Sequence, residues 1–393
     1  MFAFETGVTV AGYILKRRLD HALAEISSGK KAAGVVLEYG FETYAGFYKA
    51  FVKMYGCSPK KYLRICKSKN QEAIFMHGIN EIKKILGNWN ISTDLEVEDV
   101  TETEWQTGKK SEWTTWRVGD VYYLKTNERT KMIRNIKIAK ALSDQGLASE
   151  FTPVQTKQGH DYVDGLQIFL LTKKIGEPLT LRPQTDDEIG FSENDKLRNK
   201  HAFKLGQAIA KLHRALKSVQ IDVKPWEGNL YEQGKNAISI VKKLDLEIDE
   251  VFFSDYTENF GKLYEKLPKQ LIHGNLCVEA AVYQNGEVAA FKGFETYNLT
   301  FPRIYDVTWC AGEISPPQIG EYLKTLTEML KGYDSISPLT EEEKQSVYYV
   351  LCATYLKGYG YFTKTAETAD LMTRYDKAMV YLAKNKGKFF GLM

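Results

Sequence analysis

The sequence predicts an α+β protein in which an all-α amino-terminal unit precedes a larger mixed domain. Apolar residues recur at helical spacing through residues 13–55, and two strand-like runs flank a Gly119-Asp120 turn. Farther along, an apolar strand is followed by an amphipathic helix over residues 202–216. A chain of 393 residues exceeds what one hydrophobic core usually supports, so we expect two or three domains.

Composition excludes several classes of protein. Five cysteines are present without a CxxC pair, which favours reduced thiols over a disulfide framework or a cysteine metal site. No amino-terminal export signal is apparent, and no window approaches the roughly 20 apolar residues that cross a bilayer. We therefore expect a cytoplasmic protein with no membrane partner.

Charge is distributed unevenly along the chain. The overall net charge is +3, but residues 1–70 contain 12 Lys and Arg against 5 Asp and Glu, a local charge of +7. The remainder has a net charge of −4. A compact basic head attracts phosphate backbones, although a solvated basic face on an ordinary domain has the same composition.

Three short helices are predicted within this head. Residues 13–27 carry an apolar stripe and end near Gly29, residues 30–40 form a second helix that ends at Gly40, and residues 41–56 form a third. A tight glycine turn between two short helices fits a helix-turn-helix, but a plain helical bundle also fits. The third helix would bury one face, formed by Phe47, Ala50, Phe51 and Tyr55.

The specific residues of the head favour the first alternative. The stretch VLEYGFETYAGFYKAFVKMYGCSPKKYL, residues 36–63, closely resembles the carboxy-terminal helix-turn-helix signature of AraC-type transcription regulators. The resemblance implies that Gly40 and Phe41 make the turn and that Phe47 and Phe51 anchor the recognition helix. It also implies that Pro59 begins the closing helix.

DNA is the partner that this resemblance implies. Side chains at the start of a recognition helix meet base edges, whereas basic side chains around it suit phosphates. Solvent exposure alone would explain each of these residues equally well. The candidate DNA-binding residues are Arg17, Thr43, Tyr44, Tyr48, Lys49 and Lys53. The residues that would face the major groove are Thr43, Tyr44, Tyr48 and Lys49. The residues suited to phosphate contacts are Arg17, Lys49, Lys53 and Lys60.

The head departs from the family in one respect. AraC-type units carry two helix-turn-helix modules joined by a long helix, and residues 2–14 resemble only the end of the first module and that joining helix. We therefore expect residues 1–68 to hold a truncated DNA-binding domain with the second module alone. A homodimer would restore bivalent binding.

The body resembles a second family, the aminoglycoside phosphotransferases and choline kinases. The resemblance runs from about residue 76 to the end and includes a hairpin ending at Lys125, the loop LIHGNL at 271–276 and the segment AAFKGFE at 289–295. It implies a two-lobed, protein-kinase-like fold, with an N-lobe over 76–178 and a helical C-lobe over 179–393. Lys125 would be the lysine that contacts the nucleotide phosphates.

The residues that carry out phosphoryl transfer in that family are changed here. The loop normally reads HGDxxxxN, in which the acid accepts a hydroxyl proton, and the later segment begins with an acid that helps hold Mg²⁺. In this chain, Asn275, Ala280 and Gly293 occupy those positions. Loss of the general base alone costs about 10² to 10⁴ in rate.

We therefore expect no catalytic residues and no metal site. The loop with His273, Asn275, Ala280 and Gly293 is degenerate, and only Glu279 offers a substitute ligand nearby. The cleft of the fold would still offer a ligand site, with Lys125, Asn275 and Glu295 as its candidate residues.

Three functions remain in view. The preferred one is an AraC-type transcription regulator whose inactive phosphotransferase-like domain senses an unknown small-molecule effector or binds a partner, with no cofactor. The second is an active phosphotransferase that uses ATP and Mg²⁺ to modify a small hydroxyl compound. The third is a protein-binding scaffold, supported by the aromatic stretch at 346–362 if that stretch is exposed, although helical core packing explains it equally well.

Overall fold

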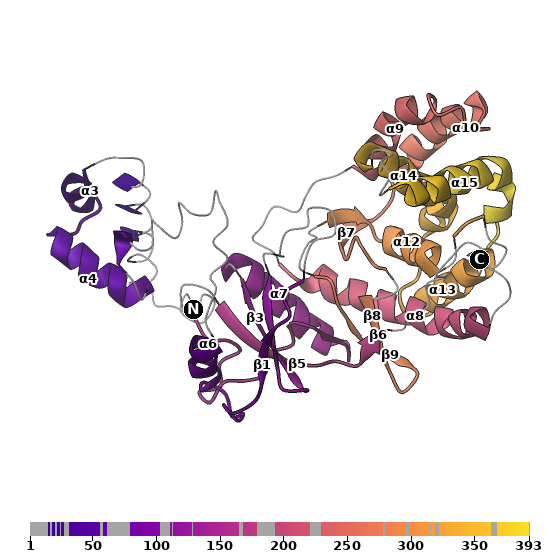
Figure 1. Ribbon diagram of the computed structural model, residues 1–393. Helices are drawn as coiled ribbons and strands as arrows, with labels where there is room; N and C mark the ends of the chain where they lie inside the picture. Colours follow the sequence, from indigo (N-terminus) through magenta and orange to yellow (C-terminus); the bar gives the residue numbers. More distant parts are fainter. Residues whose placement is uncertain are drawn as a thin grey trace. The chain divides into compact units, whose positions relative to one another are not determined.

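The computed structural model describes most of the chain, and Figure 1 shows its elements. Two compact units are present, one formed by Met1–Arg129 with Val154–Leu171 and the other by Thr130–Pro153 with Thr172–Met393. The described residues are 15, 18–19, 22–23, 25–26, 31–55, 58–60, 79–102, 111, 113–127, 129–164, 168–178, 193–220, 229–277, 280–294, 299–314, 316–318, 322–362 and 368–392.

A helix-turn-helix forms within the basic head. Helix α3 (Ala32–Glu38) ends before Gly40, whose φ of 73° is a left-handed conformation that glycine adopts without a steric penalty. Helix α4 (Tyr44–Tyr55) follows. The predicted turn at Gly40 and Phe41 is therefore confirmed. Arg18 stabilises it, because its Nε donates to the Tyr39 carbonyl at 2.6 Å and its guanidinium lies 4.7 Å from the centre of the Phe41 ring.

The head has a hydrophobic core of its own. Phe47 and Phe51 are fully buried on one side of α4, with ring centroids 5.6 Å apart, and Phe41 meets Phe47 edge to face at 5.3 Å. This confirms that Phe47 and Phe51 anchor the helix, whereas the side chain of Tyr55, which belongs to the predicted face, lies outside the described residues. The described residues between 15 and 26 are helical, as expected. The core consists of Leu19, Ala22, Leu23, Val35, Val36, Phe41, Phe47 and Phe51.

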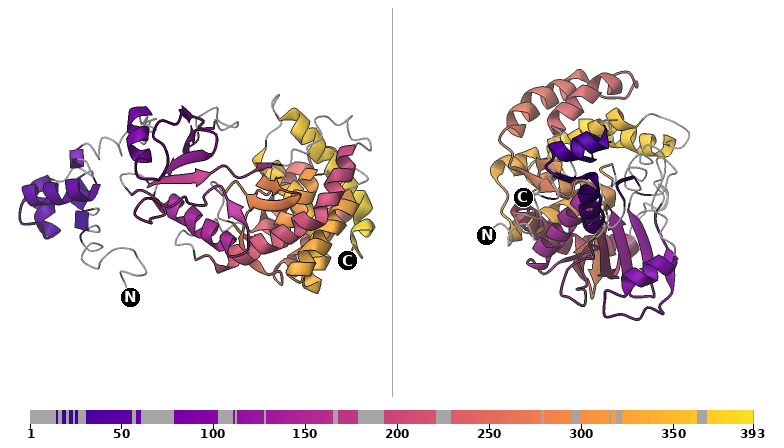
Figure 2. Two further views of the ribbon diagram at one scale, coloured as in Figure 1. Left: turned by 90° about the horizontal axis from the view of Figure 1, so that it is seen from below. Right: turned by 90° about the vertical axis from the view of Figure 1, so that its left-hand side faces the viewer.

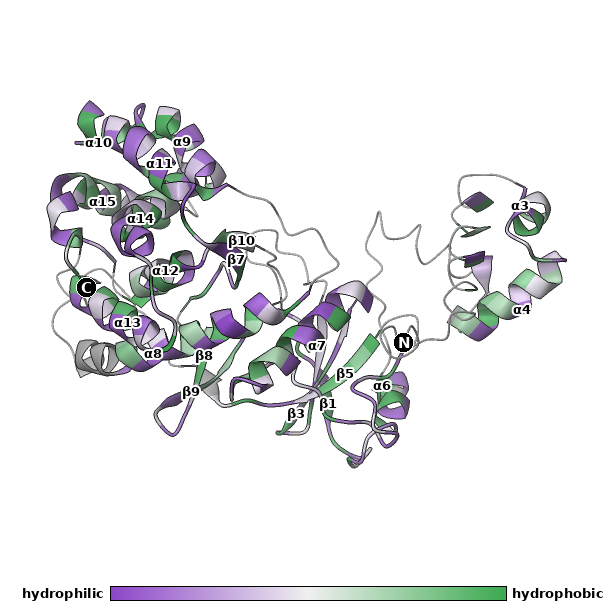
Figure 3. Cartoon of the chain, turned by 180° about the vertical axis from the view of Figure 1, so that it is seen from behind, coloured by the Kyte–Doolittle hydropathy of each residue, from purple (hydrophilic) through white to green (hydrophobic). Residues whose placement is uncertain are grey.

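A four-stranded sheet follows in the sequence, with strand order β1-β2-β3-β5. Its strands are β1 (Val97–Asp99), β2 (Thr114–Val118), β3 (Tyr122–Asn127) and β5 (Ile168–Lys173). Strands β2 and β3 form the predicted antiparallel hairpin, and Gly119 turns it with a φ of 56°. Strand β5 is largely green in Figure 3 because it begins with the apolar run IFLL, which is buried.

One helix packs its apolar side into the core of this sheet. Helix α6 (Ile79–Leu86) contributes Ile82 and Leu86, and Trp89 just beyond it donates its indole N–H to the Val154 carbonyl at 2.8 Å. Burying that indole is tolerated because its polar atom is satisfied. The cluster consists of Ile82, Leu86, Trp89, Val97, Trp116, Val118, Leu124, Phe169 and Leu171.

The second unit contains helix α7 (Arg129–Ser143) and two further sheets. Strand β7 (Lys269–Ile272) pairs with β10 (Leu299–Pro302). The other sheet has the order β4-β9-β8-β6. Its strands are β4 (Ala148–Ser149), β9 (Glu287–Phe291), β8 (Ala281–Gln284) and β6 (Glu177–Pro178). Residues 130–153 group with this unit and not with the sheet before them, so the compact units differ from the predicted division at residue 178.

Helices make up the rest of the second unit, which Figure 2 shows from two further directions. Helices α8 and α13 approach so closely that a Cβ on Gly206 would lie 2.0 Å from the Met329 carbonyl oxygen, and one on Gly332 would lie 2.0 Å from that of Phe203. Only glycine permits this contact. The helices are α8 (Glu193–Ser218), α9 (Leu230–Val241), α10 (Glu250–Asp255), a π-helical turn (Tyr256–Phe260), α11 (Gly261–Tyr264), α12 (Ile304–Ile314), α13 (Tyr322–Ile336), α14 (Glu341–Tyr361), α15 (Ala369–Asn385) and a 3₁₀ turn (Lys386–Phe389).

The aromatic stretch at 346–362 lies in α14 and is part of the core. Tyr348, Tyr349, Tyr355 and Tyr359 are each at most 8% exposed, and only Tyr361 is largely exposed. Helical core packing therefore accounts for this stretch. The alternative expectation, that it presents an exposed patch for a partner, is wrong.

Among the described helices, none combines the length and the apolar character that a membrane crossing requires.

Candidate functional site

The loop at 273–275 follows strand β7 and is held by a carboxylate from α12. Asp306, which is fully buried, accepts the backbone N–H of His273 through Oδ2 and that of Gly274 through Oδ1, both at 2.8 Å. Gly274 has a φ of 78°, which lets the chain turn back across the carboxylate. Two charge-assisted hydrogen bonds therefore fix the backbone of the loop.

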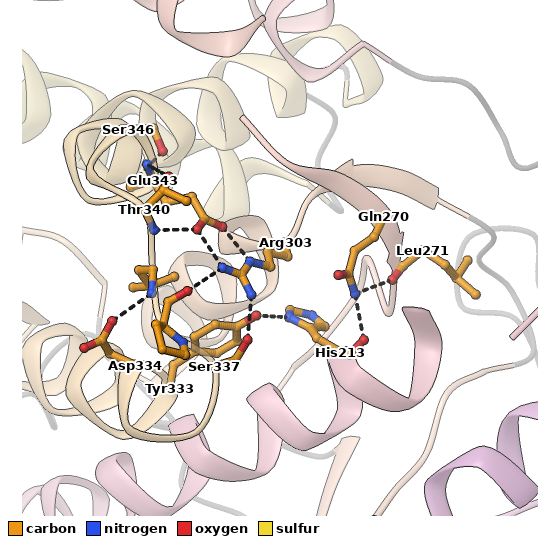
Figure 4. Close-up of polar contacts among 12 residues, drawn as sticks. His213, Gln270, Leu271, Arg303, Tyr333, Asp334, Ser337, Thr340, Glu343 and Ser346 are labelled. Atoms are coloured by element: carbon orange, nitrogen blue, oxygen red, sulfur yellow. Dashed lines mark hydrogen bonds and ion pairs between the residues drawn. The ribbon is translucent and has the colours of Figure 1, made fainter. Parts of the chain in front are cut away.

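A buried histidine supports this carboxylate from α8. His213 Nε2 lies 3.0 Å from Asp306 Oδ2, and Nδ1 lies 2.8 Å from the Tyr333 hydroxyl, as Figure 4 shows for the tyrosine contact. Since a carboxylate only accepts, Nε2 carries a proton, and Nδ1 lies within hydrogen-bond distance of the tyrosine hydroxyl. Burial raises the pKa of Tyr333, which keeps its hydroxyl protonated. No local sequence motif indicates this contact, because His213 and Asp306 are 93 residues apart.

Close to the hydrogen bonds among Tyr333, His213 and Asp306, Arg303 connects the start of α12 with the end of α13 and the start of α14. Arg303 forms a two-pronged ion pair with the fully buried Glu343, with both contacts at 2.7 Å, and donates to Ser337 Oγ at 2.6 Å. The pKa of Arg303 is raised, chiefly by its hydrogen bonds to Glu343. Glu343 also closes the capping box of α14 with Thr340 (Figure 4). The start of α12 is thereby tied to the start of α14.

His273 is neutral and buried. Its Nε2 lies 2.6 Å from the Lys292 carbonyl oxygen, so Nε2 carries the proton, and Nδ1 has no hydrogen-bond partner among the described residues. Burial lowers the pKa of His273 and outweighs the opposing effect of Asp306. This side chain therefore supports the loop as an uncharged ring packed edge to face on Phe294.

The positions that would carry the chemistry lack carboxylates. Asn275 is exposed, and its backbone carbonyl oxygen accepts the Cys277 N–H at 2.9 Å. Ala280 is buried, and its backbone bonds to Cys277 and Lys292. An amide cannot act as a carboxylate base, and a methyl group offers no oxygen to a metal.

The third changed position, Gly293, is held by residues that the sequence analysis did not single out. Its N–H donates to Glu150 Oε1 at 2.6 Å, and Arg134 from α7 donates to the carbonyl of Phe294 at 3.1 Å. Gly293 has a φ of 87°, and a Cβ there would lie 3.3 Å from the His273 ring. No local pattern connects these segments, because Glu150 and Gly293 are 143 residues apart.

Asn275, Ala280 and Gly293 offer no carboxylate to a divalent metal ion. Within the part of the chain that the structure describes, no group of three or more His, Cys, Asp or Glu residues could hold one. Glu150 accepts a hydrogen bond from the N–H of Gly293. Glu279 and Glu295 lie outside the described residues.

Lys125, the remaining cleft candidate, lies in the first compact unit. It is buried on β3, where it pairs with Thr115 on β2. Helix α7 contains no Asp or Glu.

Most candidate DNA-binding residues lie on the outward side of α4. Tyr44 and Tyr48 are 42% and 41% exposed, and Lys49 and Lys53 are also exposed. Thr43 is exposed too, and its hydroxyl accepts the N–H of Gly46 at 3.0 Å and so caps the helix. Arg17 lies outside the described residues.

Comparisons with known proteins agree with both resemblances. Residues 1–65 match the model of a helix-turn-helix domain family. An amicoumacin kinase, hAmiN, in complex with AMP-PNP, Ca²⁺ and Ami is similar in structure, with a TM-score of 0.50, 17% sequence identity, and coverage of 80% of this chain and 95% of that one. A choline/ethanolamine kinase family protein from Mesorhizobium loti gives a TM-score of 0.48 and 14% identity over 80% of this chain and 98% of that one.

No curated protein matched the chain. The chain nevertheless joins a helix-turn-helix domain at residues 1–65 to a region with the fold of the amicoumacin kinase.

Proposed function

We propose that this protein is a DNA-binding transcription regulator of the AraC type whose phosphotransferase-like domain is catalytically inactive. That domain would sense a small-molecule effector or bind a partner, and it would need no cofactor. One contrast carries the proposal: buried Asp306 still holds the loop through two backbone N–H groups, while residues 275, 280 and 293 offer no carboxylate.

The chemistry of phosphoryl transfer explains why this contrast matters. Catalysis depends on positioning and on electrostatic stabilisation, so it needs metal ions that neutralise the phosphates. Ala280 and Gly293 supply no ligand, and the described residues hold no metal-binding group. Loss of the base costs about 10² to 10⁴ in rate even before the metal is considered.

The ordered loop at 273–275 favours a domain that still binds a ligand over one that has lost every function. The hydrogen bonds from His213 to Asp306 and from Asp306 to the loop backbone keep the loop in a defined conformation. Neither side chain supplies a reacting group in this proposal. A preformed loop beside a fold that supports ligand sites lowers the ordering cost of binding. An effector that prefers one conformation of the domain would then shift the population that binds DNA.

Catalytic inactivity is tested by following ATP turnover with Mg²⁺ and a panel of aminoglycosides, choline analogues and amino sugars. We expect no phosphate transfer above the rate without protein, and no change when EDTA is added. Magnesium-dependent transfer that is lost in Lys125→Ala would overturn the proposal. Thermal shift with the same panel, without nucleotide, tests ligand sensing, and stabilisation by one compound class is the expected result.

DNA binding is tested by a mobility shift with the full chain on DNA from upstream of its own gene. Lys49→Glu reverses a charge on the outward side of α4 and should weaken binding, with a weaker salt dependence because one phosphate contact is lost. Lys243→Glu makes the same charge change at an exposed site after α9 and should leave binding unaltered. Equal loss in both variants would mean that α4 is not the contact surface.

A homodimer completes the proposal, because one helix-turn-helix reads a single groove segment. Two copies on adjacent half-sites gain affinity through effective concentration. A cooperative mobility shift on a two-half-site probe, and its absence on a single half-site, is the expected outcome.

A further inference from the structure

The outward side of α4 has an unusual chemical composition for a surface that reads DNA. Its exposed side chains come from Tyr44, Ala45, Tyr48, Lys49 and Lys53, and Val52 is half-buried beside them. The opposite side is the core face of Phe47 and Phe51.

Most of the side chains that read bases through hydrogen bonds are absent from this helix. The sequence YAGFYKAFVKMY contains no Arg, Asn, Gln, Asp or Glu, so its lysines are the only residues of the guanine-reading type. The Thr43 hydroxyl, which precedes the helix, accepts the Gly46 N–H and can still donate one hydrogen bond. The helix itself exposes methyl groups, aromatic rings, two tyrosine hydroxyls and the lysines.

The two exposed tyrosine rings are held in place by their neighbours. The Tyr44 ring centroid lies 5.8 Å from that of Phe47 and 6.4 Å from that of Tyr48. Since Phe47 is fully buried, the Tyr44 ring packs on the core through Phe47, and the Tyr48 ring packs on Tyr44. Such a surface meets an apolar partner with little further loss of side-chain entropy.

The major groove offers one apolar group of this kind, the 5-methyl group of thymine. We propose that α4 recognises its site chiefly through thymine methyl groups packed against Tyr44, Ala45 and Tyr48, so that the preferred DNA is rich in thymine at the positions under this helix. Lys49 and Lys53, four residues apart, contact phosphates and contribute affinity without sequence preference. This inference rests on the proposed DNA-binding function.

The test begins with selection of bound sequences from random DNA by the full chain. Thymines at the enriched positions are then replaced by deoxyuridine, which removes only the methyl group. We expect affinity to fall about fourfold for each buried methyl lost, the factor that corresponds to burial of one such group. At an enriched position where cytosine is also accepted in place of thymine, 5-methylcytosine supplies the methyl group again. Replacing cytosine by 5-methylcytosine there should restore part of the lost affinity.

Three variants test whether the effect arises from the tyrosine surface. Tyr48→Ala should remove most of the preference for thymine over deoxyuridine while salt-dependent binding to unrelated DNA persists. Tyr48→Phe, which keeps the ring, should retain the preference, and Lys53→Ala should weaken binding equally to both DNAs. A Tyr48→Ala chain that unfolds is recognised by circular dichroism, and the Tyr48→Phe and deoxyuridine comparisons then decide.

Three results would contradict the inference in distinguishable ways. Enriched sites with invariant guanines, weakened by 7-deazaguanine and unaffected by deoxyuridine, would assign base reading to Lys49 and overturn the thymine proposal alone. Binding without any enriched sequence would overturn it as well and leave a non-specific DNA-binding protein. Absence of binding to every DNA would remove the proposed function itself.

Discussion

Asp306 Oδ2 accepts the backbone N–H of His273 at 2.8 Å, from a position at the start of α12 that is fully buried. The same carboxylate holds Gly274 and contacts His213. This one buried carboxylate therefore fixes the backbone of the loop at 273–275, while Asn275 and Ala280 contribute no carboxylate of their own.

Loss of this carboxylate should destabilise the second unit strongly. Asp306→Ala leaves two backbone N–H groups and His213 without their acceptor, and we expect a decrease of about 3 to 5 kcal/mol in the free energy of unfolding. Asp306→Asn should fall between the alanine variant and the native protein, because one amide oxygen still accepts. Urea unfolding measures the change. Asp370→Ala, on the exposed side of α15, is the matched control and should change it by less than about 0.5 kcal/mol.

His273 should make stability depend on pH. Burial lowers its pKa in the folded chain, while the unfolded value is about 6.5. The unfolded chain then binds the proton more readily, so this contribution is complete above about pH 6.5 and is lost as pH falls through the folded pKa. Urea unfolding of the native protein and of His273→Asn between pH 8 and pH 5 should show a stability difference that narrows on acidification.

The control for that experiment is Phe294→Leu, which removes the ring contact with His273 but no titrating group. It should lower stability and keep the native dependence on pH. A difference between native protein and His273→Asn that is constant over the whole range would show that His273 does not change its proton affinity on folding.

Gly293 should resist replacement by any side chain. Its φ of 87° is unfavourable for other residues, and a Cβ would press on the His273 ring. We expect Gly293→Ala to cost about 1 to 3 kcal/mol in unfolding free energy. Gly293→Asp should cost more, since its carboxylate comes near Glu150. Restoring the family's acid would therefore not simply restore a metal ligand.

Gly360→Ala is the control for the glycine experiment. Gly360 lies in α14, and a Cβ added there would have no neighbouring atom within 4 Å, so alanine should be neutral or stabilising by up to about 1 kcal/mol. If Gly293→Ala behaves in the same way, the steric explanation for that position is wrong.

Thr43 should act as a helix cap before it acts on DNA. Thr43→Ala removes the hydroxyl that accepts the Gly46 N–H, and we expect a loss of about 1 kcal/mol in the stability of the basic head. Thr43→Ser keeps the hydroxyl and should retain the native stability. Thermal unfolding followed by circular dichroism distinguishes them. A Thr43→Ala variant with unchanged melting but altered DNA preference would instead support the groove-facing role expected from the sequence.

Local patterns in the sequence correctly predicted the local structure. Gly40 indicated the turn before α4 because glycine adopts a left-handed conformation freely, and the spacing of Phe47 and Phe51 indicated the core face of that helix. The sequence also identified the changed positions at Asn275, Ala280 and Gly293, since these depend on residue identity alone. Of the two alternatives for residues 346–362, core packing is correct and the exposed patch is wrong. Helical periodicity alone could not decide between them, because it does not reveal what packs against the second side of α14.

The sequence by itself determined which side chains are available: a helix without Arg, Asn, Gln, Asp or Glu, and no carboxylate at positions 275, 280 and 293. Only the tertiary structure decided what holds them, because His213 and Asp306 are 93 residues apart and Glu150 and Gly293 are 143 apart. Turns and helices arise from residues within a few positions of one another, whereas a buried hydrogen bond between distant segments exists only once the chain has brought them together and excluded water from both.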